Sequence, residues 1–167
     1  MKKPVVAIVM GSESDMPVME KAGEVLKEFG IGYQFRILSA HRSPDEVIRF
    51  ARTASNNGIK IIIAGAGGAA HLAGVIASHT TLPVIGVPIH TKSLGGMDSL
   101  LSTVQMPGGV PVATMAIGEA GARNAGIFAL EMLGISDKTI GARLRLYKKG
   151  LVRSVKEKDN KYRKRGI

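Results

Sequence analysis

The sequence predicts an α/β fold in which a parallel sheet of five strands lies between two layers of helices. Short apolar runs of strand length alternate along the chain with longer segments whose apolar residues recur at helical spacing. The clearest of these runs are apolar at every position, which is typical of strands that are covered on both faces of a parallel sheet. Together these patterns predict a three-layer αβα sandwich of the flavodoxin-like type, with the strand order 2-1-3-4-5.

The first half of the chain contains three pairs of a strand and a helix. Strands are expected over residues 5–10, 33–38 and 60–64, and helices over residues 17–29, 44–57 and 69–78. Gly30 and Gly58 end the first two helices. The second helix has a strong start signal, because Ser43 stands at the N-cap, Pro44 at the first helical position, and Glu46 where it closes a capping box.

The second half continues the alternation. Strands are expected over residues 83–89 and 112–116, and helices over residues 97–105 and 119–133. The first of these helices is capped from Asp98 or nearby, and the second is rich in Ala and Gly, which allow close packing, for example against another subunit. A final helix starts at Ser136 or Asp137 and runs into a basic tail. We expect one catalytic α/β domain over residues 1–135 and a basic helical extension of the same domain over residues 136–167.

Three loops rich in small or polar residues follow the first three strands, at residues 11–15, 39–42 and 65–72. In open parallel sheets ligands bind outside the carboxyl ends of the strands, so these loops are candidates for one shared site. The first loop and the helix after it offer N–H groups to a phosphate, although such loops also serve as simple helix caps. His41 and Arg42 stand in the second loop, where the alternative for the histidine is a plain surface position.

The third loop also fits a dinucleotide-binding fingerprint. Gly65, Gly67 and Ala70 match the pattern G-x-G-x-x-A after a strand. That fingerprint requires an acidic residue about 20 positions later, which holds a ribose hydroxyl group. No Asp or Glu occurs from Val47 to Met97. A nicotinamide site is therefore not expected.

The composition excludes several classes of protein. The chain has no cysteine, which rules out disulfide scaffolds, Cys-based metal sites and thiol catalysis, and which is compatible with a cytoplasmic location. Its four histidines lack the paired spacing and neighbouring carboxylates of a metal site, so no metal is expected. No run of bulky apolar residues approaches the roughly 20 that are needed to cross a bilayer.

The net charge of +10 raises a nucleic-acid hypothesis, so the distribution of the charge matters. Residues 143–165 hold eleven of the 23 basic side chains and two of the 13 acidic ones. The other 12 basic and 11 acidic side chains leave residues 1–142 with a net charge of +1. Because the charge belongs to the tail, we expect a solvated helical extension and no nucleic-acid partner.

Four motifs can be compared with those of known families. They are Gly-Ser-Glu-Ser-Asp at 11–15, Ser-Ala-His-Arg-Ser-Pro at 39–44, Gly-Ala-Gly-Gly-Ala-Ala-His-Leu at 65–72, and Asp-Ser-Leu-Leu-Ser-Thr-Val-Gln-Met-Pro at 98–107. In order and spacing they resemble the PurE family, the N5-carboxyaminoimidazole ribonucleotide mutases of purine biosynthesis, and in particular its class I microbial branch. The resemblance covers roughly residues 5–133. It departs from the family pattern mildly, with Ser43 in place of the usual Thr and Ala73 in place of the usual Pro.

The resemblance implies an isomerase that needs no cofactor and no metal. The N5-carbamate of the imidazole ribonucleotide would leave as CO2, which is trapped and attached to carbon 4 of the ring. His41 would be the proton shuttle, since an imidazole can give and take a proton near neutrality. By motif position, Ser12 and Asp15 would hold ribose and phosphate oxygens, Arg42 would pair with phosphate or carboxylate, and Ser39, Gly67 and His71 would line the base pocket.

The resemblance also implies a cytoplasmic homo-octamer that takes a small ribonucleotide and has no nucleic-acid or membrane partner. Two alternatives stay open. A related branch of the family carboxylates aminoimidazole ribonucleotide directly with CO2. The other alternative, of a different class, is a nucleotide- or nucleic-acid-binding module of flavodoxin-like fold.

Overall fold

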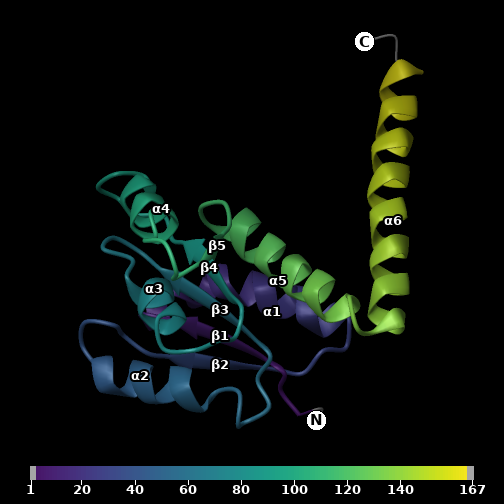
Figure 1. Ribbon diagram of the computed structural model, residues 1–167. Coiled ribbons are helices and arrows are strands. Elements are labelled where there is room, and N and C mark those ends of the chain that lie inside the picture. The colour runs from purple at the N-terminus through teal and green to yellow at the C-terminus, as the bar shows by residue number, and fades with distance from the viewer. Residues whose placement is uncertain (1–2, 165–167) are drawn as a thin grey trace. The chain divides into compact units, whose positions relative to one another are not determined.

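The structure, a computed structural model, describes residues 3–164 as an alternation of strands and helices (Figure 1). The strands are β1 (Val6–Met10), β2 (Tyr33–Ile37), β3 (Ile61–Ala66), β4 (Val84–Pro88) and β5 (Ala113–Thr114). The helices are α1 (Met16–Glu28), α2 (Pro44–Thr53), α3 (Leu72–Ala77), α4 (Met97–Val104), α5 (Glu119–Gly134) and α6 (Lys138–Arg163). A 3₁₀ turn, η1 (Glu13–Asp15), leads directly into α1.

All five strands are parallel and lie in the order β2-β1-β3-β4-β5, which confirms the predicted topology. Met10, the last residue of β1, lies opposite Ile37 of β2 and Gly65 of β3. Ala66 of β3 in turn lies opposite Pro88 of β4. The carboxyl ends of these four strands are therefore level, and the loops that follow them leave from one edge of the sheet.

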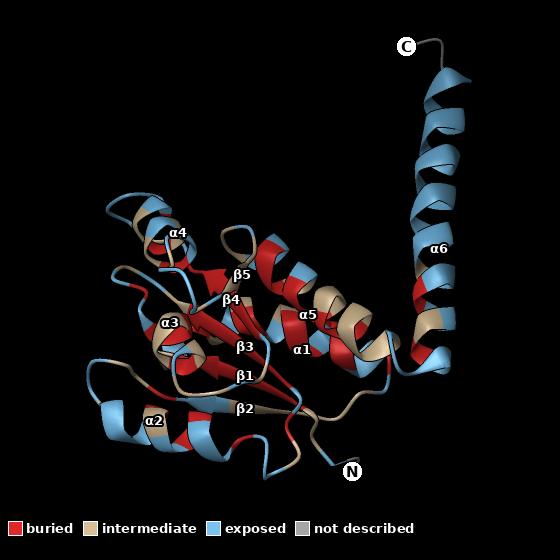
Figure 2. Cartoon of the chain, viewed as in Figure 1, coloured by how far each residue is buried: buried red, intermediate tan, exposed pale blue. Residues whose placement is uncertain are grey.

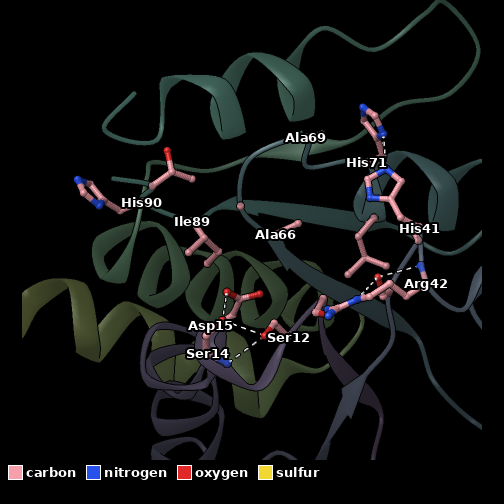
Figure 3. Close-up of a pocket in the computed structure, with 16 residues that line it drawn as sticks. Ser12, Ser14, Asp15, His41, Arg42, Ala66, Ala69, His71, Ile89 and His90 are labelled. Atoms are coloured by element: carbon pink, nitrogen blue, oxygen red, sulfur yellow. Dashed lines mark hydrogen bonds between the residues drawn. The ribbon is translucent and has the colours of Figure 1, made fainter. Parts of the chain in front are cut away.

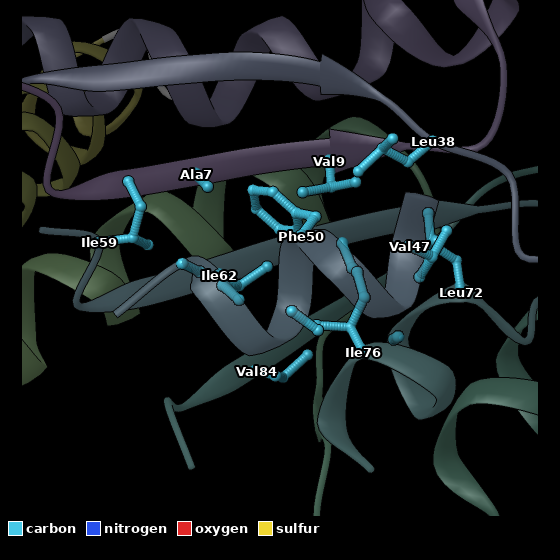
Figure 4. Packing of buried hydrophobic residues seen from close by; sticks show 14 residues of the cluster. Ala7, Val9, Leu38, Val47, Phe50, Ile59, Ile62, Leu72, Ile76 and Val84 are labelled. Carbon is cyan, nitrogen blue, oxygen red and sulfur yellow. The ribbon is translucent and has the colours of Figure 1, made fainter. Parts of the chain in front are cut away.

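The central strands are buried because helices cover both faces of the sheet (Figures 1 and 2). Every residue of β1 and β4 is buried, whereas the edge strand β2 is partly exposed. On one face, apolar side chains of β1 and β3 pack against α2 and α3 (Figure 4). This cluster includes Ala7, Val9, Ile62 and Ala64 from the strands and Val47, Phe50, Leu72 and Ile76 from the helices. On the other face, Gly65 leaves room for the thioether of Met19, which a Cβ atom at position 65 would overlap.

The part of α5 up to Ala129 packs against α1. Gly126 permits this contact, because a Cβ atom there would lie 2.9 Å from the carbonyl oxygen of Ala22. Ala122 and Ala125 are completely buried. Ala122, Ala125 and Gly126 therefore serve packing inside the chain, and packing of this helix against another subunit stays a prediction.

The chain forms two compact units, which divide between Ala129 and Leu130. In the second unit, α6 begins where the sequence predicts, with Asp137 as its N-cap. The Asp137 carboxylate accepts hydrogen bonds from the backbone N–H groups of Thr139, at 2.8 Å, and Ile140, at 3.2 Å. One catalytic domain over residues 1–135, with residues 136–167 as its helical extension, stays a prediction.

The predicted capping box of α2 is not formed. Ser43 does stand at the N-cap, but its side chain makes other contacts. The Ser43 hydroxyl group donates to the carbonyl oxygen of Ser39 and accepts from the N–H of Ser39, both at 3.1 Å. It is therefore occupied by the turn after β2 and makes no cap hydrogen bond. The Glu46 carboxylate pairs with Arg49 on the helix surface instead of closing the box.

Three other helix ends can be compared with the predictions. A cap from Asp98 or nearby was expected for α4: the N-cap is the nearby Gly96 (φ 88°), whereas Asp98 accepts a hydrogen bond from the Thr91 hydroxyl group at 2.8 Å. The helix after β2 is shorter than predicted because a turn that ends at Gly58 (φ 86°) follows it. The helix after β3 starts late because the preceding loop contains Gly68 in the left-handed region (φ 70°).

Within residues 3–164, no helix is both long and apolar enough to cross a membrane. Helix α6 is the longest, and every described residue after Tyr147 is exposed. This part of the helix carries most of the basic tail, of which Arg165 lies outside the described residues.

We expect this basic helix to bind short DNA or RNA only at low salt. Nonspecific binding to phosphates releases counterions, so its affinity falls steeply as the salt concentration rises. Fluorescence anisotropy with labelled oligonucleotides, measured from low to physiological salt, checks the prediction. Tight binding that persists at physiological salt would instead favour the nucleic-acid-binding module.

Candidate active site

A cavity of about 490 Å³ opens at the carboxyl edge of the sheet, where the loops after β1, β2, β3 and β4 meet (Figure 3). All seven residues that the sequence singled out line it: Ser12, Asp15, Ser39, His41, Arg42, Gly67 and His71. The structure therefore brings together side chains from three loops that are far apart in the sequence. This position is the one expected for a ligand in an open parallel sheet.

Hydroxyl groups and one carboxylate form one side of the cavity, from the loop after β1. The Ser12 hydroxyl oxygen caps η1 by accepting from the N–H of Ser14 at 3.3 Å, and it also accepts from the Ser14 hydroxyl group at 2.9 Å. Asp15 is buried, with 8% of its surface exposed. Its side chain makes no cap hydrogen bond to α1, so the simple capping role that the sequence left open is not observed.

Burial raises the pKa of the Asp15 carboxyl group above its ordinary value. Hydrogen bonds from the Ser12 backbone and the Ser14 side chain oppose this effect, as does the nearby positive charge of Arg42. The carboxylate is thus kept in a partly desolvated place in which a polar ligand group would be a favourable partner. Perturbed groups of this kind inside a cavity are candidates for function.

Arg42 joins the loops after β1 and β2. Its Nη2 atom donates to the carbonyl oxygen of Gly11 at 2.8 Å, and its Nε atom donates to the Ser39 hydroxyl oxygen at 3.3 Å. The Ser39 hydroxyl oxygen also accepts from the backbone N–H of Arg42 at 3.2 Å. The guanidinium group is therefore held at the cavity wall, where its charge can attract an anion.

The two predicted histidines face each other on another part of the wall (Figure 3). The Nε2 atom of His41 lies 2.8 Å from the Nδ1 atom of His71, and the rings meet edge to face at an interplanar angle of 75°. One of these nitrogens must donate and the other accept, so a single proton lies between them. Both side chains are exposed to the cavity solvent. The pair can therefore exchange a proton with a bound ligand.

The backbone after β3 forms a wall of the cavity at Gly67. A Cβ atom at Gly67 would lie 3.5 Å from both the Ile89 and the Thr91 side chains, in ordinary van der Waals contact. The loop after β3 therefore lies directly against the segment after β4. Three further residues line the cavity that were not predicted from the sequence: Ser14 in the loop after β1, and His90 and Thr91 in the segment after β4. The position of His90 directly after a strand was the signal that could have found it.

No group of three His, Asp or Glu side chains that could hold a metal ion occurs within residues 3–164. The expectation of a site without metal or cofactor stays a prediction.

Comparisons with known proteins show the family of this chain. A family model described as AIR carboxylase matches residues 5–154. The chain is 54% identical over 165 residues to a protein of Pyrococcus horikoshii, and this match covers 99% of this chain and 92% of that protein. It is 57% identical over 155 residues to a protein of Thermotoga maritima, and this match covers 93% of this chain and 90% of that protein. Both relatives are named N5-carboxyaminoimidazole ribonucleotide mutase.

Among solved structures, that of Treponema denticola PurE matches with a TM-score of 0.86 at 30% sequence identity. The match covers 95% of this chain and 98% of the other. Sequence motifs, fold and family model therefore agree, and the chain belongs to the AIR carboxylase family, to which its resemblance to PurE had pointed.

Proposed function

We propose that this protein is a mutase of purine biosynthesis, which converts N5-carboxyaminoimidazole ribonucleotide to 4-carboxyaminoimidazole ribonucleotide by decarboxylation and recarboxylation. The observation that carries the proposal is the single cavity in which an imidazole pair, a guanidinium group and a hydroxyl-carboxylate cluster line one space. Such a space can take a molecule that has an ionisable ring as well as a polar ribose phosphate. The names of the relatives support the same reaction.

His41 carries the proton transfers in this proposal. It protonates the nitrogen from which the carbamate leaves as CO2, and this step leaves the ring amine and a neutral imidazole. Carbon 4 of the ring then attacks the trapped CO2, and His41 removes the proton from carbon 4, which restores the aromatic ring. One group thus gives a proton and takes one back, so no net acid or base is consumed.

His71 supports His41 as a neutral hydrogen-bonding partner. Its Nδ1 atom lies 2.8 Å from the Nε2 atom of His41, so it can accept a hydrogen bond from the protonated His41 ring. Two imidazolium ions at this distance would repel each other, so the pair is suited to one cycling proton. We therefore place the shuttle on His41 and a positioning role on His71.

The remaining predicted residues bind the substrate. Ser12 and Asp15 accept or donate to the ribose and phosphate oxygens, Arg42 pairs with phosphate or carboxylate, and Ser39 and Gly67 line the base pocket. The hydrogen bonds of Arg42 to Gly11 and Ser39 support its role, because they aim the guanidinium group across the loops that form the cavity.

Incubation of the purified protein with each substrate separates this reaction from the alternative within the family. We expect N5-carboxyaminoimidazole ribonucleotide alone to be converted, with no requirement for added bicarbonate. Efficient product formation only from aminoimidazole ribonucleotide with CO2 would assign the protein to direct carboxylation. Lack of turnover with both substrates would instead favour the other alternative, a nucleotide- or nucleic-acid-binding module.

The proposal includes a cytoplasmic homo-octamer, which the resemblance to PurE implies. The expected mass in solution is about eight times that of the 17.6 kDa chain. Light scattering after size-exclusion chromatography, or sedimentation velocity, measures this mass directly. A monodisperse species of any other subunit number would contradict this part of the proposal.

A further inference from the structure

One buried hydroxyl group outside the cavity joins two of the segments that line it. Ser99 of α4 is fully buried, with none of its surface exposed. Its Oγ atom accepts a hydrogen bond from the backbone N–H of Gly68 at 3.0 Å and donates one to the carbonyl oxygen of Ile89 at 2.7 Å. A carbonyl oxygen can only accept and an N–H group can only donate, so the directions of both bonds are fixed.

The two backbone groups lie just beyond the ends of neighbouring strands. The N–H of Ile89 still bonds to the carbonyl oxygen of Ala66 at 2.9 Å, but the ladder between β3 and β4 ends there. The N–H of Gly68 belongs to the loop that leads to His71. Ser99 thus continues the connection between the two strands past the edge of the sheet, through its side chain.

The spacing that Ser99 sets is part of the cavity wall. A Cβ atom at Gly67, next to Gly68, would be in van der Waals contact with the Ile89 and Thr91 side chains. Gly67, Ile89 and Thr91 all line the cavity. His71 follows four residues after Gly67, and its ring holds His41 at 2.8 Å. A shift of this loop would therefore move the ring that faces His41.

A second buried hydroxyl group on the same helix provides a contrast. Thr103 is also buried, and its Oγ1 atom donates to the carbonyl oxygen of Ser99 at 2.7 Å, within α4. Among the described residues, its side chain forms a hydrogen bond within α4 and none to either cavity loop. The Ser102 hydroxyl group donates to the carbonyl oxygen of Asp98 at 2.7 Å within α4, and its contact with the Gly68 carbonyl oxygen is long, at 3.5 Å. The bridge between the loops is thus a particular property of Ser99.

We propose that Ser99 is a positioning residue for the reaction: its hydroxyl group locks the loop of Gly67 to His71 against the segment after β4 and so holds His71 in place beside His41. The inference rests on the proposed function. Because the ribose and phosphate end of the cavity comes from the loop after β1, which Ser99 does not touch, loss of the bridge should lower turnover and leave substrate binding largely intact.

The test compares Ser99→Ala and Ser99→Cys, which remove or weaken the bridge, with Ser99→Thr, which keeps the hydroxyl group. Thr103→Val is the matched control, since it removes an equally buried hydroxyl group from the same helix. With N5-carboxyaminoimidazole ribonucleotide, we expect Ser99→Ala and Ser99→Cys to lower kcat at least tenfold with KM changed less than threefold. Ser99→Thr should recover kcat to within about threefold of the wild type, and Thr103→Val should stay within twofold.

Hydrogen–deuterium exchange of the same full-length proteins gives a second readout that does not depend on turnover. We expect peptides that cover residues 67–71 to exchange at least tenfold faster in Ser99→Ala and Ser99→Cys, and at the wild-type rate in Thr103→Val. Unchanged exchange in these peptides would overturn the bridge. Faster exchange together with a kcat within twofold of the wild type would overturn the positioning role. A wild-type protein that does not turn over the substrate would refute the proposed function, and exchange would still decide the bridge.

Discussion

Replacing His41 by Asn is expected to lower turnover by at least about 100-fold, the lower end of what general acid–base catalysis contributes. Asparagine keeps a similar size and some hydrogen bonding, but it cannot carry a proton through the cycle. The Ser12 to Asp15 side of the cavity is untouched, so the substrate should still bind. Steady-state kinetics with N5-carboxyaminoimidazole ribonucleotide gives kcat, and equilibrium binding of the product gives the affinity.

His79→Asn is the control for this change. His79 lies after α3, where its Nδ1 atom lies 3.0 Å from the Val75 carbonyl oxygen, and it does not line the cavity. This variant should keep normal turnover. His71→Asn is the informative competitor: if it abolishes turnover while His41→Asn remains close to normal, the proton shuttle is His71 and the assignment to His41 is wrong.

Replacing Asp15 by Asn is expected to raise the KM for the ribonucleotide about tenfold or more. A hydrogen bond to a charged group contributes about 1.5–3 kcal/mol, which corresponds to at least this factor. Since the Asp15 side chain does not cap α1, removal of its charge should not destabilise the fold. We therefore expect weaker substrate binding without a loss of thermal stability, as measured by kinetics and by a melting curve on the same sample.

The pH dependence of stability has a definite sign at this position. Burial raises the pKa of Asp15, so the folded protein binds this proton more tightly than the unfolded chain does. The stabilisation is complete below the ordinary aspartate pKa of about 3.9 and is lost as the pH rises through the higher folded value. The Tm of Asp15→Asn relative to the wild type should therefore increase from pH 4 to pH 7. Asp45→Asn, at an exposed aspartate, is the control for the substitution itself.

A clear drop in Tm for Asp15→Asn, with unchanged KM, would assign Asp15 to structure alone. The same pair of measurements on Arg42→Ala reports on the guanidinium group. There, a modest loss of stability is expected because the bonds to Gly11 and Ser39 disappear, together with a raised KM.

The location of the site could be predicted from the sequence because it follows from the order of the strands. Once β1, β2 and β3 are parallel neighbours, the loops that hold Asp15, His41 and His71 must leave from one edge. The buried strands are apolar at nearly every position, which made this order accessible to pattern reasoning. The same argument, applied to β4, would have added Thr91 to the predicted set.

Side-chain contacts were less predictable because several partners compete for each polar group. Ser43 and Asp98 have the right residue types and positions for helix caps, yet they bond to Ser39 and Thr91 across loops. The same limit applies to Ser99, whose partners are 31 and 10 residues away in the sequence. Such bonds depend on where the loops lie once the sheet has formed, and local sequence patterns do not contain that information.

In the proposed mutase reaction a carboxylate moves within the cavity, from the exocyclic N5 amino nitrogen to carbon 4 of the ring, while CO2 stays trapped. The most direct measurement uses substrate labelled with ¹³C in the N5-carbamate, incubated with the protein in unlabelled bicarbonate buffer. We expect 4-carboxyaminoimidazole ribonucleotide to retain the label in its new carboxylate. Product that carries only unlabelled carbon from the buffer would contradict the mutase and indicate direct carboxylation.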